Sequence, residues 1–151
     1  MGMKVVIIMG SAADQPWADE IATAVKAWGI EVVSHISSAH KVPEHTMGLV
    51  QRYQAEQQVI YVTVAGRSNA LSGAVAANSV HPVIACPPFK DKADYLTNIH
   101  SSLQMPSDVP ALTVLEPKNV AAACARIFGL VDAGMRSKVA GCLSEVKASF
   151  K

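Results

Sequence analysis

The stretch KVVIIMGSAAD, residues 4–14, runs from a nearly continuous apolar segment into a short polar loop. Such an apolar segment is far shorter than the ~18 residues of a membrane helix and is typical of a strand buried on both faces. Behind the loop, Trp17, Ile21, Val25 and Trp28 recur at helical spacing, and Gly29 then ends the pattern. The stretch therefore predicts a buried strand that leads through a loop into an amphipathic helix.

The same alternation of short β-rich runs and helical patterns continues along the chain. Strands are predicted at 4–9, 31–36, 59–64, 82–86 and 111–115, and further helices at 43–57, 70–77, 92–103 and 119–128, the last capped by Asn119. Right-handed crossovers between parallel strands place such helices on both faces of a sheet. We therefore expect an open three-layer α/β/α sandwich around a central parallel sheet.

One helical pattern is left over after this α/β core of residues 4–130. Its apolar stripe, in residues 131–150, consists of Met135, Val139, Leu143, Val146 and Phe150. A length of 151 residues predicts one domain over 1–151. With 50% hydrophobic and only 17% charged residues, part of the surface is expected to be covered by other subunits. The terminal helix either docks on its own core or packs on a neighbouring subunit, and we expect the latter.

Charge and cysteine content exclude several classes of protein. A formal charge of +1 leaves no basic footprint for nucleic acid. The start Met1-Gly2-Met3-Lys4 leaves no room for the cleavage region of a signal peptide. Cys86, Cys124 and Cys142 lack metal-ligand spacing and lie in apolar stretches, so we expect buried free thiols. The sequence predicts a cytoplasmic protein that binds neither nucleic acid nor membranes.

Polar loops follow the first three predicted strands, at the edge where open parallel sheets bind their ligands. In the first loop, Ser11 offers a hydroxyl beside the amides of a helix N-terminus, which together suit an anion. Asp14 either accepts hydrogen bonds from a sugar diol or caps the helix that follows. In the third loop, Arg67 presents a positive fork for a carboxylate or phosphate. Alternatively, Arg67 pairs with a surface acid, and Ser68 or Asn69 caps the next helix.

The second loop, Ser38-Ala39-His40-Lys41, places a hydroxyl, an imidazole and an ammonium group directly after a strand. Among the five histidines, only His40 has such neighbours. An unperturbed imidazole pKa near ~6.5 lets this side chain both take and give a proton near neutral pH. A single histidine is more often structural, but this position at a sheet's carboxyl edge favours an acid–base role for His40.

Taken together, these loops resemble the phosphoribosylaminoimidazole carboxylase family of purine biosynthesis. The matching motifs are Met9-Gly10-Ser11 with Asp14, Ser38-Ala39-His40-Lys41 with Pro43-Glu44, Ala65-Gly66-Arg67-Ser68-Asn69, Cys86-Pro87-Pro88, the run from Ser101 to Ser107, and Leu115-Glu116-Pro117-Lys118-Asn119. Each motif alone is weak, but six in the right order are specific. The resemblance covers Lys4 to about Leu130 and implies a flavodoxin-like fold.

The family has two classes, which differ in the third loop. Mutases move a carboxylate from the exocyclic nitrogen of 5-(carboxyamino)imidazole ribonucleotide to ring carbon C4, and their third loop carries a histidine among glycines and alanines. The other class carboxylates 5-aminoimidazole ribonucleotide with carbon dioxide, and its third loop reads Gly-Arg-Ser-Asn. This chain has Gly66-Arg67-Ser68-Asn69, and Lys41 where mutases usually have arginine. The resemblance thus favours the carbon-dioxide-using class, with the mutase as the alternative and no metal or cofactor.

The resemblance also implies roles for residues at matching positions. It implies that Ser11 and Lys41 bind the phosphate and that Asp14 binds the ribose hydroxyls. Ser38 and Ala39 would line the ribonucleotide site, and His40 would be the catalytic acid and base. Gly66, Arg67 and Ser68 would shape the pocket for the carboxylate or carbon dioxide. Both classes usually have a hydroxyl where Ala13 stands, which weakens the first loop's share in phosphate binding. A homo-tetramer or homo-octamer is the expected assembly. A non-catalytic nucleotide-binding module is the outside alternative, although no aromatic residue lies in the three loops.

Overall fold

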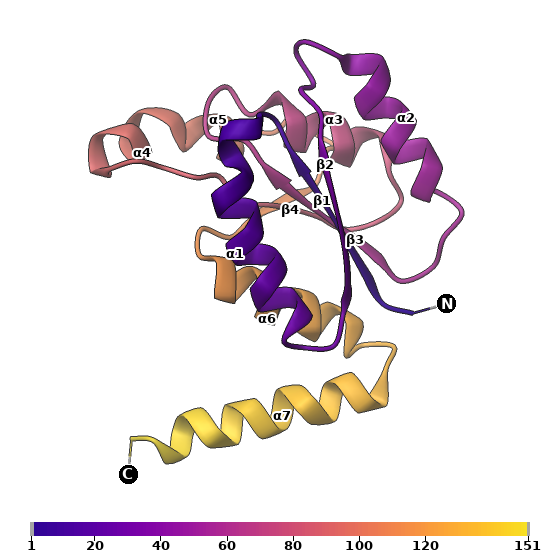
Figure 1. Cartoon of the computed structure of the whole chain (residues 1–151), viewed down its shortest axis with the longest axis vertical. Coiled ribbons are helices and arrows are strands. Elements are labelled where there is room, and N and C mark those ends of the chain that lie inside the picture. The colour runs from indigo at the N-terminus through magenta and orange to yellow at the C-terminus, as the bar shows by residue number, and fades with distance from the viewer. Residues whose placement is uncertain (1, 151) are drawn as a thin grey trace.

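The computed structural model describes residues 2–150 and contains a five-stranded parallel sheet in the order β2-β1-β3-β4-β5 (Figure 1). The strands are β1 (Lys4–Met9), β2 (Glu31–Ile36), β3 (Val59–Val64), β4 (Val83–Ala85) and β5 (Ala111–Thr113). The predicted bounds of the first three strands are confirmed. The last two strands are shorter than predicted, although Cys86 and Val114 still donate backbone hydrogen bonds to the neighbouring strand one residue further on.

Seven helices and one 3-10 turn connect the strands in the described part of the chain. They are η1 (Ala12–Asp14), α1 (Gln15–Lys26), α2 (Pro43–Tyr53), α3 (Ala70–Asn78), α4 (Lys92–Asn98), α5 (His100–Leu103), α6 (Pro117–Phe128) and α7 (Ala133–Ala148). The helix predicted over 92–103 is divided at Ile99 into α4 and α5. The predicted cap of α6 is wrong: the Glu116 carboxylate caps this helix by accepting from the Asn119 backbone N–H at 2.7 Å. Pro117 in the first turn fits this earlier start, since its ring fixes a helical φ.

The side chains of β1 alternate between two apolar cores. Val5, Ile7 and Met9 pack with α1 and α6, and Val6 and Ile8 pack with α2 and α3. The helices therefore cover both faces of the sheet, and the predicted three-layer flavodoxin-like sandwich is confirmed. All five of these side chains are at most 1% exposed. Burial of each contributes about 1.5–3 kcal/mol to stability, so β1 is held firmly in its register between β2 and β3.

Helix α7 lies outside the three layers (Figure 1). Met135 is its buried side chain, and the Arg136 guanidinium donates to the Gly129 carbonyl at 3.1 Å. Further along, Leu143, Val146 and Phe150 are 41%, 52% and 85% exposed in the single chain. Packing of this stripe on a neighbouring subunit remains a prediction.

The cysteine prediction is right for two residues and wrong for the third. Cys86 and Cys124 are buried, and this burial raises the pKa of each thiol to about 12. Cys142 is exposed, because α7 has no second layer over it in the single chain. No helix within residues 2–150 is long and apolar enough to cross a membrane.

Candidate functional site

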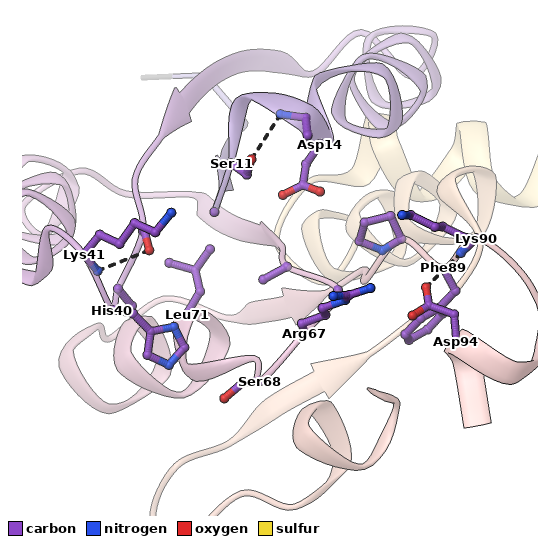
Figure 2. Close-up of a pocket in the computed structure, with 17 residues that line it drawn as sticks. Ser11, Asp14, His40, Lys41, Arg67, Ser68, Leu71, Phe89, Lys90 and Asp94 are labelled. Carbon is purple, nitrogen blue, oxygen red and sulfur yellow. Dashed lines mark hydrogen bonds between the residues drawn. The ribbon is translucent and has the colours of Figure 1, made fainter. Parts of the chain in front are cut away.

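A pocket of about 570 Å³ opens at the carboxyl edge of the sheet, between the loops that follow β1, β2, β3 and β4 (Figure 2). It brings together all nine residues that the sequence singled out: Ser11, Asp14, Ser38, Ala39, His40, Lys41, Gly66, Arg67 and Ser68. The parallel sheet explains this convergence, because it directs the ends of neighbouring strands to the same edge. The roles of these residues remain predictions.

The first loop holds its two polar side chains in different ways. The Ser11 hydroxyl accepts from the Ala13 backbone N–H at 3.2 Å and thereby caps the 3-10 turn. Within residues 2–150, the Asp14 side chain makes no capping hydrogen bond, so the capping alternative is wrong for this residue. Burial raises the pKa of Asp14 above its usual range, and a hydrogen bond from the Ser11 backbone offsets part of this effect. The Asp14 carboxylate points into the pocket, where a ligand hydroxyl can reach it (Figure 2).

The second loop is a compact turn. The Val42 backbone N–H donates to the Ser38 carbonyl at 2.9 Å, and the Lys41 N–H donates to the Ser38 hydroxyl at 3.3 Å. The turn leaves His40 and Lys41 exposed, on the side of the pocket opposite Lys90 and Asp94 (Figure 2). An imidazole placed in this way is accessible to a bound molecule, which an acid–base role requires.

The third loop is held against the loop after β4. A Cβ on Gly66 would lie 2.6 Å from the Pro88 carbonyl oxygen, so only glycine permits this approach. Ser68 adopts a positive φ of 42°. The buried Asn69 caps α3, accepting from the Ser72 N–H at 3.1 Å, as one alternative predicted. Arg67 is exposed and forms no ion pair within residues 2–150, so pairing with a surface acid finds no support.

Four lining residues were not singled out in the sequence: Leu71, Phe89, Lys90 and Asp94. The Phe89 ring packs edge-on against Tyr95, with centroids 5.2 Å apart. The Asp94 carboxylate accepts from the Lys90 backbone N–H at 3.0 Å and so fixes this segment. Three of the four residues follow the Pro87-Pro88 turn after β4, to which the sequence analysis assigned no site residue. Its place after a parallel strand was the signal that could have identified them.

Cations outnumber acids around the pocket. Lys41, Arg67 and Lys90 line it together with Asp14 and Asp94. This positive surplus, with hydroxyls and backbone amides close by, suits an anionic small molecule. The fold and the pocket together define the class of protein: a flavodoxin-like α/β protein with a polar pocket, lined by more cations than acids, at the carboxyl edge of its sheet.

Comparisons with known proteins specify the family within this class. The family model described as AIR carboxylase matches residues 4–149. Phosphoribosylaminoimidazole carboxylase of Archaeoglobus fulgidus is 51% identical over 91% of this chain and 76% of its own length, and that of Treponema denticola is 46% identical over 85% and 80%. The crystal structure of Treponema denticola PurE superposes with a TM-score of 0.90 at 42% identity, covering 97% of this chain and 93% of its own. The crystal structure of a Treponema denticola PurE2 variant superposes with a TM-score of 0.92 at 41% identity, covering 99% of this chain and 94% of its own.

The chain belongs to the AIR carboxylase family. The resemblance drawn from the loop motifs is therefore confirmed, and with it the assignment to an enzyme family of purine biosynthesis.

Proposed function

We propose that the protein is a cytoplasmic enzyme that carboxylates 5-aminoimidazole ribonucleotide at C4 with carbon dioxide. The product is 4-carboxy-5-aminoimidazole ribonucleotide, an intermediate of de novo purine biosynthesis. The observation that carries this choice is the Gly66-Arg67-Ser68-Asn69 loop, whose first three residues line the same pocket as His40. The mutase class usually has a histidine among small residues in this loop, and none is present here.

The proposed reaction needs only positioning and one proton transfer. The amino group makes C4 of the aminoimidazole ring nucleophilic in the manner of an enamine, and C4 forms a bond to the carbon of carbon dioxide. The ring then carries both the new carboxylate and the original C4 proton. The neutral His40 imidazole takes this proton, and aromaticity is restored. The Arg67 guanidinium or nearby backbone amides stabilise the developing carboxylate.

The remaining lining residues suit binding of the ribonucleotide. Ser11 and Lys41 provide a hydroxyl and a cation for the phosphate, and the Asp14 carboxylate accepts hydrogen bonds from the ribose hydroxyls. Ser38 and Ala39 form the wall between these groups and His40. Gly66 and Ser68 shape the space beside Arg67, where carbon dioxide would meet the ring. A metal or organic cofactor has no step in this mechanism.

An assay of two substrates tests the class. Purified protein should convert aminoimidazole ribonucleotide to the C4 carboxylate, with an initial rate that rises with dissolved carbon dioxide. The carboxyamino isomer is the matched substrate and should turn over poorly in buffer depleted of carbon dioxide. Efficient turnover of that isomer without carbon dioxide would reject the proposal and establish the mutase.

We also propose that the protein assembles as a homo-tetramer or homo-octamer through α7. A symmetric assembly would cover the exposed Leu143, Val146 and Phe150. Deleting the residues after Leu130 should lower the particle mass measured by light scattering. Leu143→Ser with Val146→Ser is a milder variant that keeps the chain length and should have the same effect. A full-length chain that is monomeric at micromolar concentration contradicts this proposal.

A further inference from the structure

Three polar side chains form a chain of hydrogen bonds behind the second loop. The Ser37 hydroxyl lies 2.8 Å from the Thr46 hydroxyl and 3.0 Å from Nδ1 of His45. The Thr46 hydroxyl in turn donates to the Val42 carbonyl at 3.4 Å. Ser37 and Thr46 are 1% and 0% exposed, so water does not compete for the bond between their hydroxyls, whereas the His45 side chain at the outer end is exposed. None of the three residues lines the pocket.

Only one direction of donation satisfies all three contacts. Each hydroxyl has a single proton to donate, and the Val42 carbonyl can only accept. If Thr46 donates to Val42, then Ser37 must donate to Thr46, and His45 must donate from Nδ1–H to Ser37. The opposite direction, with Ser37 donating to His45, leaves the contact between Thr46 and Val42 without a proton. The chain therefore runs from the His45 imidazole through two buried hydroxyls to a backbone carbonyl.

The two ends of this chain bracket the segment that carries His40 and Lys41. At one end, Ser37 directly follows β2 and donates its backbone N–H to the Met9 carbonyl of β1 at 2.9 Å. At the other end, Val42 precedes α2, and its carbonyl accepts from the Thr46 backbone N–H at 3.2 Å. Residues 38–41 therefore lie between an anchor to the sheet and an anchor to α2.

We propose that Ser37, His45 and Thr46 are positioning residues, which we call the clasp, and that they hold residues 38–42 so that His40 and Lys41 meet the substrate. The catalytic part of this inference rests on the proposed function, whereas the ordering of the loop does not. A displacement of about 1 Å in a catalytic group can lower a rate by about a hundredfold. Loss of the clasp should therefore lower turnover more than nucleotide affinity. Turnover depends on the exact placement of His40, whereas Ser11 and Asp14 still hold the nucleotide from another loop and the long Lys41 side chain can still reach the phosphate.

Two pairs of variants test the clasp. Thr46→Val removes the hydroxyl and keeps the shape, whereas Thr46→Ser keeps the hydroxyl. His45→Ala removes the donor, whereas His45→Asn retains a polar group near the position of Nδ1. We expect Thr46→Val and His45→Ala to lower kcat about 10- to 100-fold and to change nucleotide affinity by less than about threefold. Thr46→Ser and His45→Asn should recover most of this loss. Hydrogen exchange of the backbone amides of residues 38–42 should rise in the first variant of each pair.

Tyr61→Phe is the matched control for a purely structural effect. The Tyr61 hydroxyl donates to the Val50 carbonyl at 3.2 Å, so this variant also removes a buried hydrogen bond to α2 but leaves the loop untouched. It should lower the Tm without changing kcat or the hydrogen exchange of residues 38–42.

Two results would overturn the proposal. Unchanged hydrogen exchange of residues 38–42 in both Thr46→Val and His45→Ala overturns the clasp, and raised exchange with unchanged kcat overturns its positioning role. If Thr46→Val does not fold, the comparison of His45→Ala with His45→Asn decides, because His45 is exposed and its replacement leaves the core intact. A wild-type protein inactive on both substrates refutes the proposed function, and exchange alone then judges the clasp.

Discussion

Replacing His40 with asparagine is expected to lower turnover by about two to four orders of magnitude, the usual contribution of a positioned acid or base. The fold should persist, because His40 is exposed and its side chain takes no part in the hydrogen bonds of the turn, which run from the Val42 N–H to the Ser38 carbonyl and from the Lys41 N–H to the Ser38 hydroxyl. Asparagine keeps a polar side chain but cannot accept the C4 proton near neutral pH. The measurement is kcat with saturating aminoimidazole ribonucleotide and carbon dioxide, beside nucleotide affinity by calorimetry.

Lys41→Ala provides the contrasting result. This variant removes a phosphate contact of similar strength in the ground state and the transition state, so apparent affinity should fall while kcat stays close to normal. Nucleotide affinity in His40→Asn should instead remain within a few-fold of the wild type. Near-normal turnover in His40→Asn would remove this residue from the mechanism, and Arg67 or a bound water would then be the next base to test.

The sequence predicts the central strands well because their burial leaves a simple pattern. Strands β1 and β3 are buried along almost their whole length, and an uninterrupted apolar run of six residues or fewer has few other interpretations. The errors come from features that local sequence does not determine. Asparagine is favoured at helix N-caps, so the sequence indicated Asn119, whereas the cap of α6 is Glu116, three residues earlier. Cys142 is apolar in sequence context but lies on a helix that projects from the core.

The site was predicted where the polar residues are consecutive in sequence. Two such runs, Ser38 to Lys41 and Gly66 to Ser68, each follow a predicted strand. Because the carboxyl ends of parallel strands meet at one edge of the sheet, the two runs are expected to lie together there. Lys90 and Asp94 were not predicted, because two prolines separate them from β4, and Asp94 lies on α4 rather than in a loop directly behind a strand. These two residues line the pocket because the loop after β4 lies close to the loop after β3. That close approach follows from the packing of Gly66 against Pro88, which the sequence alone does not show.

Replacing Gly66 with alanine is expected to damage both stability and turnover. The new methyl group would lie 2.6 Å from the Pro88 carbonyl oxygen, a distance that requires the backbone to move. Overpacking of this kind costs about 1–3 kcal/mol of unfolding free energy. Separation of the two loops also shifts Arg67 and Lys90, which line the pocket on either side of this contact, so kcat/KM should fall about 10- to 100-fold. Denaturant unfolding and steady-state kinetics measure the two effects.

Gly10→Ala is the matched control, because Gly10 follows β1 at the same edge of the sheet. Its added methyl group would lie 3.7 Å from the Ala65 Cβ and 3.8 Å from the Val64 carbonyl oxygen, which are ordinary contact distances. The free energy of unfolding of this variant should therefore stay within about 0.5 kcal/mol of the wild type, the usual range for a substitution that meets no special constraint. If Gly66→Ala is as stable as Gly10→Ala and retains normal kcat/KM, then the loops after β3 and β4 can separate freely. Their close approach would in that case not shape the pocket around Arg67.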